Sequence, residues 1–270
     1  MKTLFLAATL ACTLLAGGAV QADDALKAAI AGDQRTPGNA SRDAARHPYE
    51  TLEFFGIKPG MTVVELAPGA GWYTEILAPY LHDGGQLIAA GNDPQSPNAN
   101  RRASAALFQK FLDGHPASFG KVQVGAFEPP VNYHYAAKGS ADLVLTFRNI
   151  HNWIPLGETR LKQLFGSVYD SLKPGGVFGV VEHRLPAAMV QDAEASTGYL
   201  HEDYVIKLIQ GAGFKLVAKS EINANPKDHA DHKGGVWALP PTYTNGVEER
   251  DQYTAIGESD RMTLKFVKPL

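Results

Sequence analysis

Two histidines with polar neighbours are the residues of this chain best suited to acid–base chemistry. One is His151 in the segment RNIHNW (148–153), and the other is His183 in the segment EHR (182–184). An imidazole titrates near neutral pH, so either ring could take a proton from a reacting group. Each segment directly follows an apolar run typical of a buried strand, and we therefore expect both rings to face one pocket. The other candidates for a catalytic or substrate-binding role are Arg148 and Asn149.

A purely structural role is the alternative for the same residues. In that interpretation Arg148 and Glu182 form an ion pair that ties two loops together, and the asparagines cap turns. Both interpretations require the two loops to lie next to each other.

A second group of candidates lies in the segment VVELAPGAGWYTEIL (63–77), in which an apolar run is followed by a turn of small residues and then by a helical pattern. Glycines let the backbone approach a ligand closely, and the N-terminus of the following helix favours a carboxylate. A tight turn that needs small residues for packing alone is the alternative. The candidates for ligand binding in this segment are Glu65, Ala67, Gly69, Gly71 and Trp72.

The elements that must position these residues alternate between strand and helix patterns. Such alternation predicts a mostly parallel sheet with helices on both faces. In such sheets a ligand binds beyond the carboxyl ends of the strands, near the point where the strand order reverses. The predicted strands are 62–67, 86–91, 122–127, 142–147, 177–182, 214–220 and 262–267.

Three segments in this order resemble motifs of the class I S-adenosylmethionine-dependent methyltransferases: VVELAPGAG (63–71), ADLVLTFRN (141–149) and LKPGGVFGVVEH (172–183). The resemblance covers about residues 45–270. It implies a doubly wound, Rossmann-like sheet of about seven strands with the last strand antiparallel, and S-adenosylmethionine as the cofactor. More narrowly, these segments together with NANPKDHADHKGGVWALPP (223–241) resemble a group of secreted bacterial predicted methyltransferases.

The resemblance also implies roles for individual residues. Glu65 would receive the ammonium of the cofactor through the turn, and Trp72 would stand at the pocket wall. The family usually has Gly at the position of Ala67, and Ala fits there only if its φ stays negative. The family's acids for the ribose and the adenine correspond to Gly91 and Ala126 here. The nearby acids that would replace them by a longer reach are Asp93 and Glu128.

These departures leave two functions open. The first is a secreted methyltransferase acting on a small-molecule acceptor. The second is a non-catalytic periplasmic protein on the same fold that binds another small ligand.

The N-terminal residues have the pattern of an export signal. A charged start at Lys2, an apolar run over 4–15 and small residues up to Ala22 predict a signal peptide over 1–22. Cys12 lies inside the apolar run, which argues against its use as a lipid anchor. Residues 23–44 are a polar leader, predicted to be loosely held, and 45–270 form the main domain. Within it, an insertion over about 223–260 is predicted to form a lid or wall over the substrate side.

Composition narrows the possible partners. Removing Lys2 with the signal leaves 24 basic against 28 acidic residues, without a basic stripe, so neither nucleic acid nor stable membrane insertion of the mature chain is expected. Cys12 is the only cysteine, which excludes disulfides and thiolate metal sites in the mature chain. His229 and His232 in the segment HADH are predicted to lie in a solvated loop, so no metal site is expected. The oligomeric state remains open.

Overall fold

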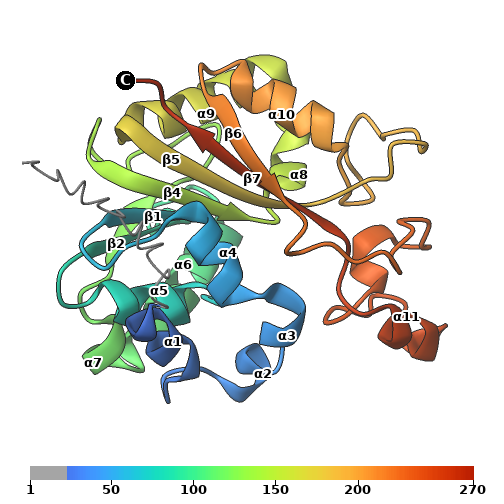
Figure 1. The fold of residues 1–270 in the computed structure, drawn as a ribbon, viewed down its shortest axis with the longest axis horizontal. Helices are drawn as coiled ribbons and strands as arrows, with labels where there is room; N and C mark the ends of the chain where they lie inside the picture. The colour runs from blue at the N-terminus through green and yellow to red at the C-terminus, as the bar shows by residue number, and fades with distance from the viewer. Residues whose placement is uncertain (1–22) are drawn as a thin grey trace, which may run out of the picture.

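The computed structural model describes residues 23–270, so the predicted signal peptide over 1–22 lies outside the described residues. The described part is built on a seven-stranded sheet with the order β3-β2-β1-β4-β5-β7-β6 (Figure 1). All pairings are parallel except those of β7, which runs antiparallel to β5 and β6. The predicted doubly wound sheet is confirmed. The strands are β1 (Thr62–Leu66), β2 (Gln86–Gly91), β3 (Gln123–Ala126), β4 (Ala141–Phe147), β5 (Leu172–His183), β6 (Lys215–Ser220) and β7 (Arg261–Val267).

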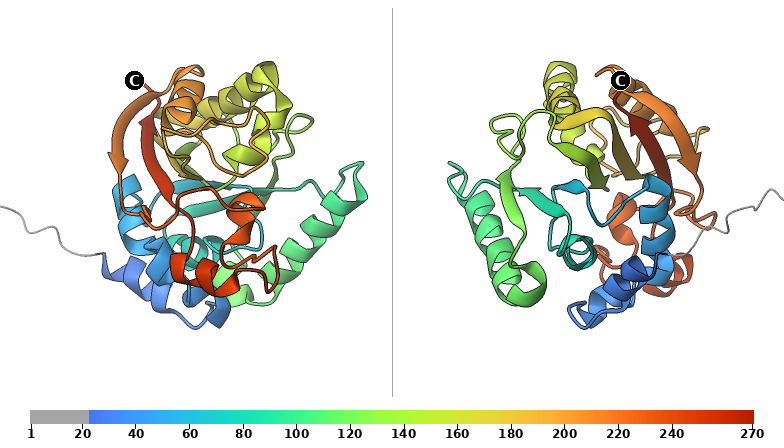
Figure 2. Two further views of the ribbon diagram at one scale, coloured as in Figure 1. Left: turned by 90° about the vertical axis from the view of Figure 1, so that its right-hand side faces the viewer. Right: turned by 60° about the vertical axis from the view of Figure 1, so that its left-hand side comes forward.

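Helices cover both faces of the sheet, as Figures 1 and 2 show. Side chains alternate between the two faces of a strand, so Val64 and Leu66 of β1 join one core while Val63 joins the other. One core is closed by α8 (Ile150–Trp153), α9 (Glu158–Ser171) and α10 (Glu202–Gln210). The other is closed by α1 (Asp24–Ala31), α4 (Pro48–Phe55), α5 (Thr74–Leu81), α6 (Ala99–Asp113) and α7 (Pro116–Phe119).

The predicted strand bounds hold to within about one residue, except at β5. The predicted turn over 172–176 is part of this strand, because Leu172 already pairs with Ala141. The next matched pair is Leu143 with Val177, so the residues in between bulge out of the ladder.

The prediction that residues 23–44 are loosely held is wrong. Helix α1 packs against α5 with Leu26 fully buried. The buried Arg35 then pairs with Glu75 at 3.2 Å and with Asp43 at 2.7 Å. Trp72 Nε1 also donates to the backbone oxygen of Asn39 at 3.0 Å. The polar composition of the segment suggested exposure, but its charges are used in buried ion pairs.

The segment between β6 and β7 crosses the edge of the sheet where β1, β4 and β5 end (Figure 1). It includes α11 (Arg250–Ile256) and lies next to α3 (Asp43–Arg46). Glu258 of this segment forms an ion pair with Arg46 of α3 at 3.1 Å. This edge is therefore flanked by α3 from the N-terminal part and by the segment between β6 and β7. Among residues 23–270, no helix has the length and apolar character that crossing a membrane requires.

Candidate functional site

The strand order reverses between β1 and β4, so the turn after β1 and the loop after β4 lie side by side. Asn149 joins them, because its Nδ2 donates to the backbone oxygen of Leu66 at 3.2 Å. Ala67 in the turn has a φ of +50°. The condition of a negative φ at Ala67 is therefore not met, and the chain places a Cβ-bearing residue in the left-handed region where the family usually has glycine.

Two hollows border this turn, and a third follows the loop after β4. The apolar hollow, of about 470 Å³, lies between the turn and α6 and is lined mainly by Leu107, Phe108, Phe111, Val124 and Phe127. The turn hollow, of about 230 Å³, is lined by Glu65, Gly69, Trp72, Arg148 and Asn149, among others. The histidine hollow, of about 290 Å³, is lined by His151, His183, Trp237 and several arginines. The first two share Gly69 and Asn149, and the last two share Arg148, so the three hollows are neighbours along one side of the molecule.

The two glycines of the turn differ in what surrounds them. Gly69 has a φ of +60°, and a Cβ built there would meet no atom within 4 Å. It lines both the apolar hollow and the turn hollow. A Cβ on Gly71 would instead approach the ring of Phe111 to 2.5 Å. Gly69 therefore leaves space for a ligand, whereas Gly71 allows α6 to pack against the turn.

Glu65 is buried at the end of β1 and accepts a hydrogen bond from the Thr74 hydroxyl at 2.6 Å. Burial raises the pKa of Glu65 to about 7, and the bond from Thr74 opposes this rise only in part. A ligand ammonium beside Glu65 would favour the ionised carboxylate. The side chain is therefore suited to a cationic group in the turn hollow.

Glu65 should make stability depend on pH. Its pKa in the folded protein lies above the ordinary value of 4.5, so the stability that it contributes is full below pH 4.5 and is lost as the pH rises through about 7. We expect this group to lower the free energy of unfolding by about 2.5 kcal/mol between pH 5 and pH 8. Glu65→Gln should remove that fall, as measured by urea unfolding at both pH values. An identical pH dependence in the variant and the wild type would contradict the expectation.

Asp93 and Glu128, predicted to reach the ligand, line none of the three hollows. Glu128 is buried, accepts from the Ser96 hydroxyl at 2.7 Å and pairs with Arg101 at 2.8 Å. Asp93 accepts from Asn132 Nδ2 at 2.6 Å. Both carboxylates hold the loops after β2 and β3 in place, and their binding of a ligand stays a prediction. Trp72 does line the turn hollow, where its indole lies 4.6 Å from the Arg46 guanidinium.

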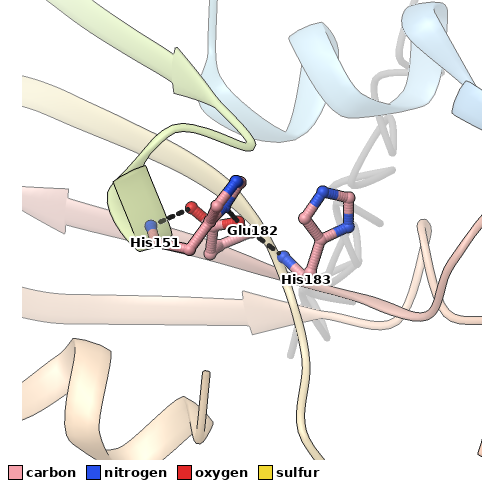
Figure 3. A group of neighbouring side chains, drawn as sticks. All are labelled: His151, Glu182 and His183. Carbon is pink, nitrogen blue, oxygen red and sulfur yellow. Dashed lines mark hydrogen bonds and ion pairs between the residues drawn. The ribbon is translucent and has the colours of Figure 1, made fainter. Parts of the chain in front are cut away.

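His151 is held by a buried carboxylate, as Figure 3 shows. Its Nδ1 lies 2.9 Å from Glu182 Oε1, and a carboxylate oxygen can only accept, so Nδ1 carries the proton. Glu182 also accepts from the backbone nitrogens of Ile150 and His183. This arrangement fixes the ring orientation and leaves His151 Nε2 as the basic nitrogen on a residue that lines the histidine hollow.

His183 lines the same hollow, with its ring centroid 5.3 Å from that of His151. Its Nδ1 lies 2.6 Å from the hydroxyl of Ser259. Burial lowers the pKa of His183 well below its ordinary value, and the neighbouring His151 and arginines lower it further, so this imidazole is neutral at physiological pH. The structure thus brings both predicted histidines to one hollow, where only His151 has a carboxylate partner.

Ligand atoms of His151, Glu182 and His183 lie within 4.8 Å of one another, which is a spacing compatible with a metal ion. The oxygens of Glu182 are already engaged, however, and the surrounding arginines disfavour a cation.

The HADH segment (229–232) was predicted to be a solvated loop, but the structure shows it packed. Asp228 is buried and accepts from Tyr199 at 2.9 Å, and His232 Nε2 lies 2.8 Å from the same carboxylate. His229 is exposed, so this segment is a packed turn.

The sequence did not indicate the arginine cluster that lies at the histidine hollow. Four guanidiniums surround the single carboxylate of Glu258, at 2.6 Å for Arg42, 3.1 Å for Arg46, 3.2 Å for Arg261 and 4.0 Å for Arg148. The alternative ion pair between Arg148 and Glu182 is therefore not formed. The only sequence signal for the cluster is weak: Arg42 and Arg46 are four residues apart, and Arg261 follows Glu258 by three.

The insertion between β6 and β7 forms one wall of the histidine hollow. Trp237 lies with its ring 5.8 Å from the ring of His151. Pro240, Pro241 and Thr242 continue the same wall. The segment thus lies beside the predicted histidines, and its role as a lid or wall over a substrate stays a prediction.

Comparisons with known proteins identify the fold. No protein-family model matches the chain, and no curated protein matches it. Among solved structures, the chain is similar to an S-adenosylmethionine-dependent methyltransferase from Aquifex aeolicus, with a TM-score of 0.55 and 15% identity over 84% of this chain and 93% of that one. It is similar to geranyl diphosphate methyltransferase in complex with S-adenosylmethionine, with a TM-score of 0.55 and 13% identity over 90% and 94%. It is also similar to the [4+2]-cyclase SpnF, with a TM-score of 0.57 and 14% identity over 91% and 92%.

Proposed function

We propose that the protein is an S-adenosylmethionine-dependent methyltransferase that acts on a small molecule. The observation that carries this proposal is the open space beside Gly69, which lines both the apolar hollow and the turn hollow, while the turn hollow shares Arg148 with the hollow that His151 lines. The fold is shared with structures described as methyltransferases of this kind. The fold alone does not define the chemistry, so the proposal rests on the site.

The residues present fit this cofactor at both ends. Leu107 and Val124 are exposed apolar side chains that line the apolar hollow, and a bound adenine would cover them. Glu65 and Asn149 line the turn hollow, where they would hold the amino-acid end. The ribose would meet Asn92 at the end of β2 rather than a carboxylate. The bound cofactor supplies an activated methyl group for a single displacement.

The residues of the chain then position the acceptor and remove its proton. His151 Nε2 accepts the proton from the attacking group, and Glu182 stabilises the resulting imidazolium through Nδ1. The neutral His183 lines the same hollow and can orient the acceptor by a hydrogen bond. Trp237 and the two prolines beside it exclude water from the reacting atoms. In this mechanism His151 is the catalytic base, and Glu182 is a positioning residue.

A non-catalytic ligand-binding protein remains the second candidate, and a specific observation favours it. Of the acids predicted for the nucleoside end, Asp93 and Glu128 are both engaged in loop contacts and do not line the apolar hollow. A ligand without ribose hydroxyls does not need these carboxylates, so their absence from the apolar hollow would not weaken its binding.

We further propose that the protein acts outside the cytoplasm. The support for this location is the pattern over residues 1–22, in which a positive start precedes an apolar run and small residues. Mass spectrometry of the periplasmic fraction should show a mature chain that begins near Asp23. A full-length cytoplasmic species as the main form would contradict the location.

The two functions differ in one measurable product. The purified protein is incubated with S-adenosylmethionine and a panel of small phenols, amines, thiols and carboxylic acids, and the S-adenosylhomocysteine formed is measured. A methyltransferase should form it only in the presence of an acceptor. Tight binding of S-adenosylhomocysteine without turnover on any member of a broad panel would favour the binding protein.

A further inference from the structure

The arginine cluster around Glu258 holds more positive charge than its protein partners neutralise. Four guanidiniums meet one carboxylate within 4.0 Å. Asp260, two residues further along the chain, is already paired with Arg184 at 2.9 Å. Grouping buried like charges is costly unless each charge is paired. The cluster therefore requires an explanation beyond the stability of the fold.

Arg46 shows where the missing partner belongs. Its guanidinium is almost fully buried, and within residues 23–270 its Nη1 has no hydrogen-bond partner. Arg46 and Arg148 line both the turn hollow and the histidine hollow. Burial, together with the charge of Arg148, lowers the pKa of Arg46 to about 8. An anion in the histidine hollow would supply both the missing acceptor and the missing negative charge.

The cofactor cannot fill this role by itself. S-adenosylmethionine carries a single carboxylate against an ammonium and a sulfonium, so its binding adds positive charge to the site. If Arg46 or Arg148 held that carboxylate, the remaining guanidiniums would still exceed the negative charge of Glu258. The electrostatic balance has to come from the second ligand of the site.

We propose that the methyl acceptor is a small molecule with an anionic group, either a carboxylate or a phosphate, held by Arg46 and Arg148 in the histidine hollow. This inference rests on the proposed methyl transfer. The hollow of about 290 Å³ limits the acceptor to a small molecule. The wall formed by Trp237, Pro240 and Pro241 favours a flat apolar body. With the anion on the arginines, the reacting atom can lie beside His151, on the same hollow.

The test uses benzoate and inorganic phosphate as separate probes, because they distinguish a carboxylate on an apolar ring from a phosphate. Each is titrated calorimetrically into the full mature protein at low salt, with and without saturating S-adenosylhomocysteine. We expect at least one probe to bind, and to bind also in the presence of S-adenosylhomocysteine. Arg148→Gln should weaken this binding about tenfold or more. The matched control is Arg160→Gln, which removes the same charge from an exposed residue and should leave the affinity unchanged.

Several results would overturn the proposal. These are the failure of both probes to bind the wild type, an unchanged affinity in Arg148→Gln, and displacement of the probe by S-adenosylhomocysteine, which would assign the cluster to the cofactor. If Arg148→Gln does not fold, Arg42→Gln replaces it with the same expected direction, because Arg42 is partly exposed. S-adenosylhomocysteine binding without probe binding would refute this inference alone. Probe binding without S-adenosylhomocysteine binding would refute the proposed methyl transfer, and the acceptor role with it.

Discussion

Gly69→Val is expected to abolish the binding of S-adenosylhomocysteine while the protein stays folded. The valine side chain would enter the space beside Gly69, which contains no protein atom within 4 Å, so it meets the ligand rather than the protein. We expect the affinity to fall more than a hundredfold. The measurement is calorimetric titration of the variant, together with thermal unfolding to establish that it is folded.

Gly139→Val provides a matched control for the strain of this substitution. Gly139 has a φ of +64°, close to the +60° of Gly69, and a Cβ built there also meets no atom within 4 Å. Both variants should lose similar stability, on the order of 1–2 kcal/mol, from placing a branched residue in the left-handed region. Only Gly69→Val should lose binding. Equal affinity in the two variants would show that the turn is structural.

His151→Ala is expected to reduce the rate of methyl transfer about a hundredfold or more, because it removes the positioned base. Binding of S-adenosylhomocysteine should change little, since His151 lines the histidine hollow and not the turn hollow. The rate is measured as S-adenosylhomocysteine formed with the best acceptor, and kcat should fall more than KM rises.

Two further variants separate catalysis from packing. Glu182→Gln keeps the shape of the partner but weakens the hold on His151 Nδ1, so it should lower kcat and shift the pH profile of kcat. His134→Ala removes an exposed histidine and should leave both constants unchanged. An unchanged kcat in His151→Ala would assign a packing role to the buried ring.

The fold could be predicted from the sequence because each element is encoded locally. Apolar runs mark buried strands such as β1 and β4, and alternation with helices determines which edge carries the ligand. The loops after β1 and β4 could therefore be predicted to lie together. The antiparallel direction of β7 was predicted only from the family resemblance, because local pattern does not determine how strands pair.

The details that the sequence did not predict depend on contacts between distant residues. Glu128 had the charge to reach a ligand, but Ser96 and Arg101 hold it inside a loop. The polar segment before residue 45 is fixed by Arg35 and Glu75, which are forty residues apart. The arginine cluster brings α3 together with the start of β7, more than two hundred residues along the chain. Such pairings have no period or motif in a single sequence.

The central claim is that the surface around Gly69 binds S-adenosylmethionine, and calorimetric titration of the wild-type protein with S-adenosylhomocysteine tests it most directly. The account predicts one site per chain, with binding that tightens as the pH rises through about 7, because the ligand ammonium favours the ionised Glu65 carboxylate. No heat of binding at any pH between 6 and 8, in a protein shown to be folded by thermal unfolding, would contradict it.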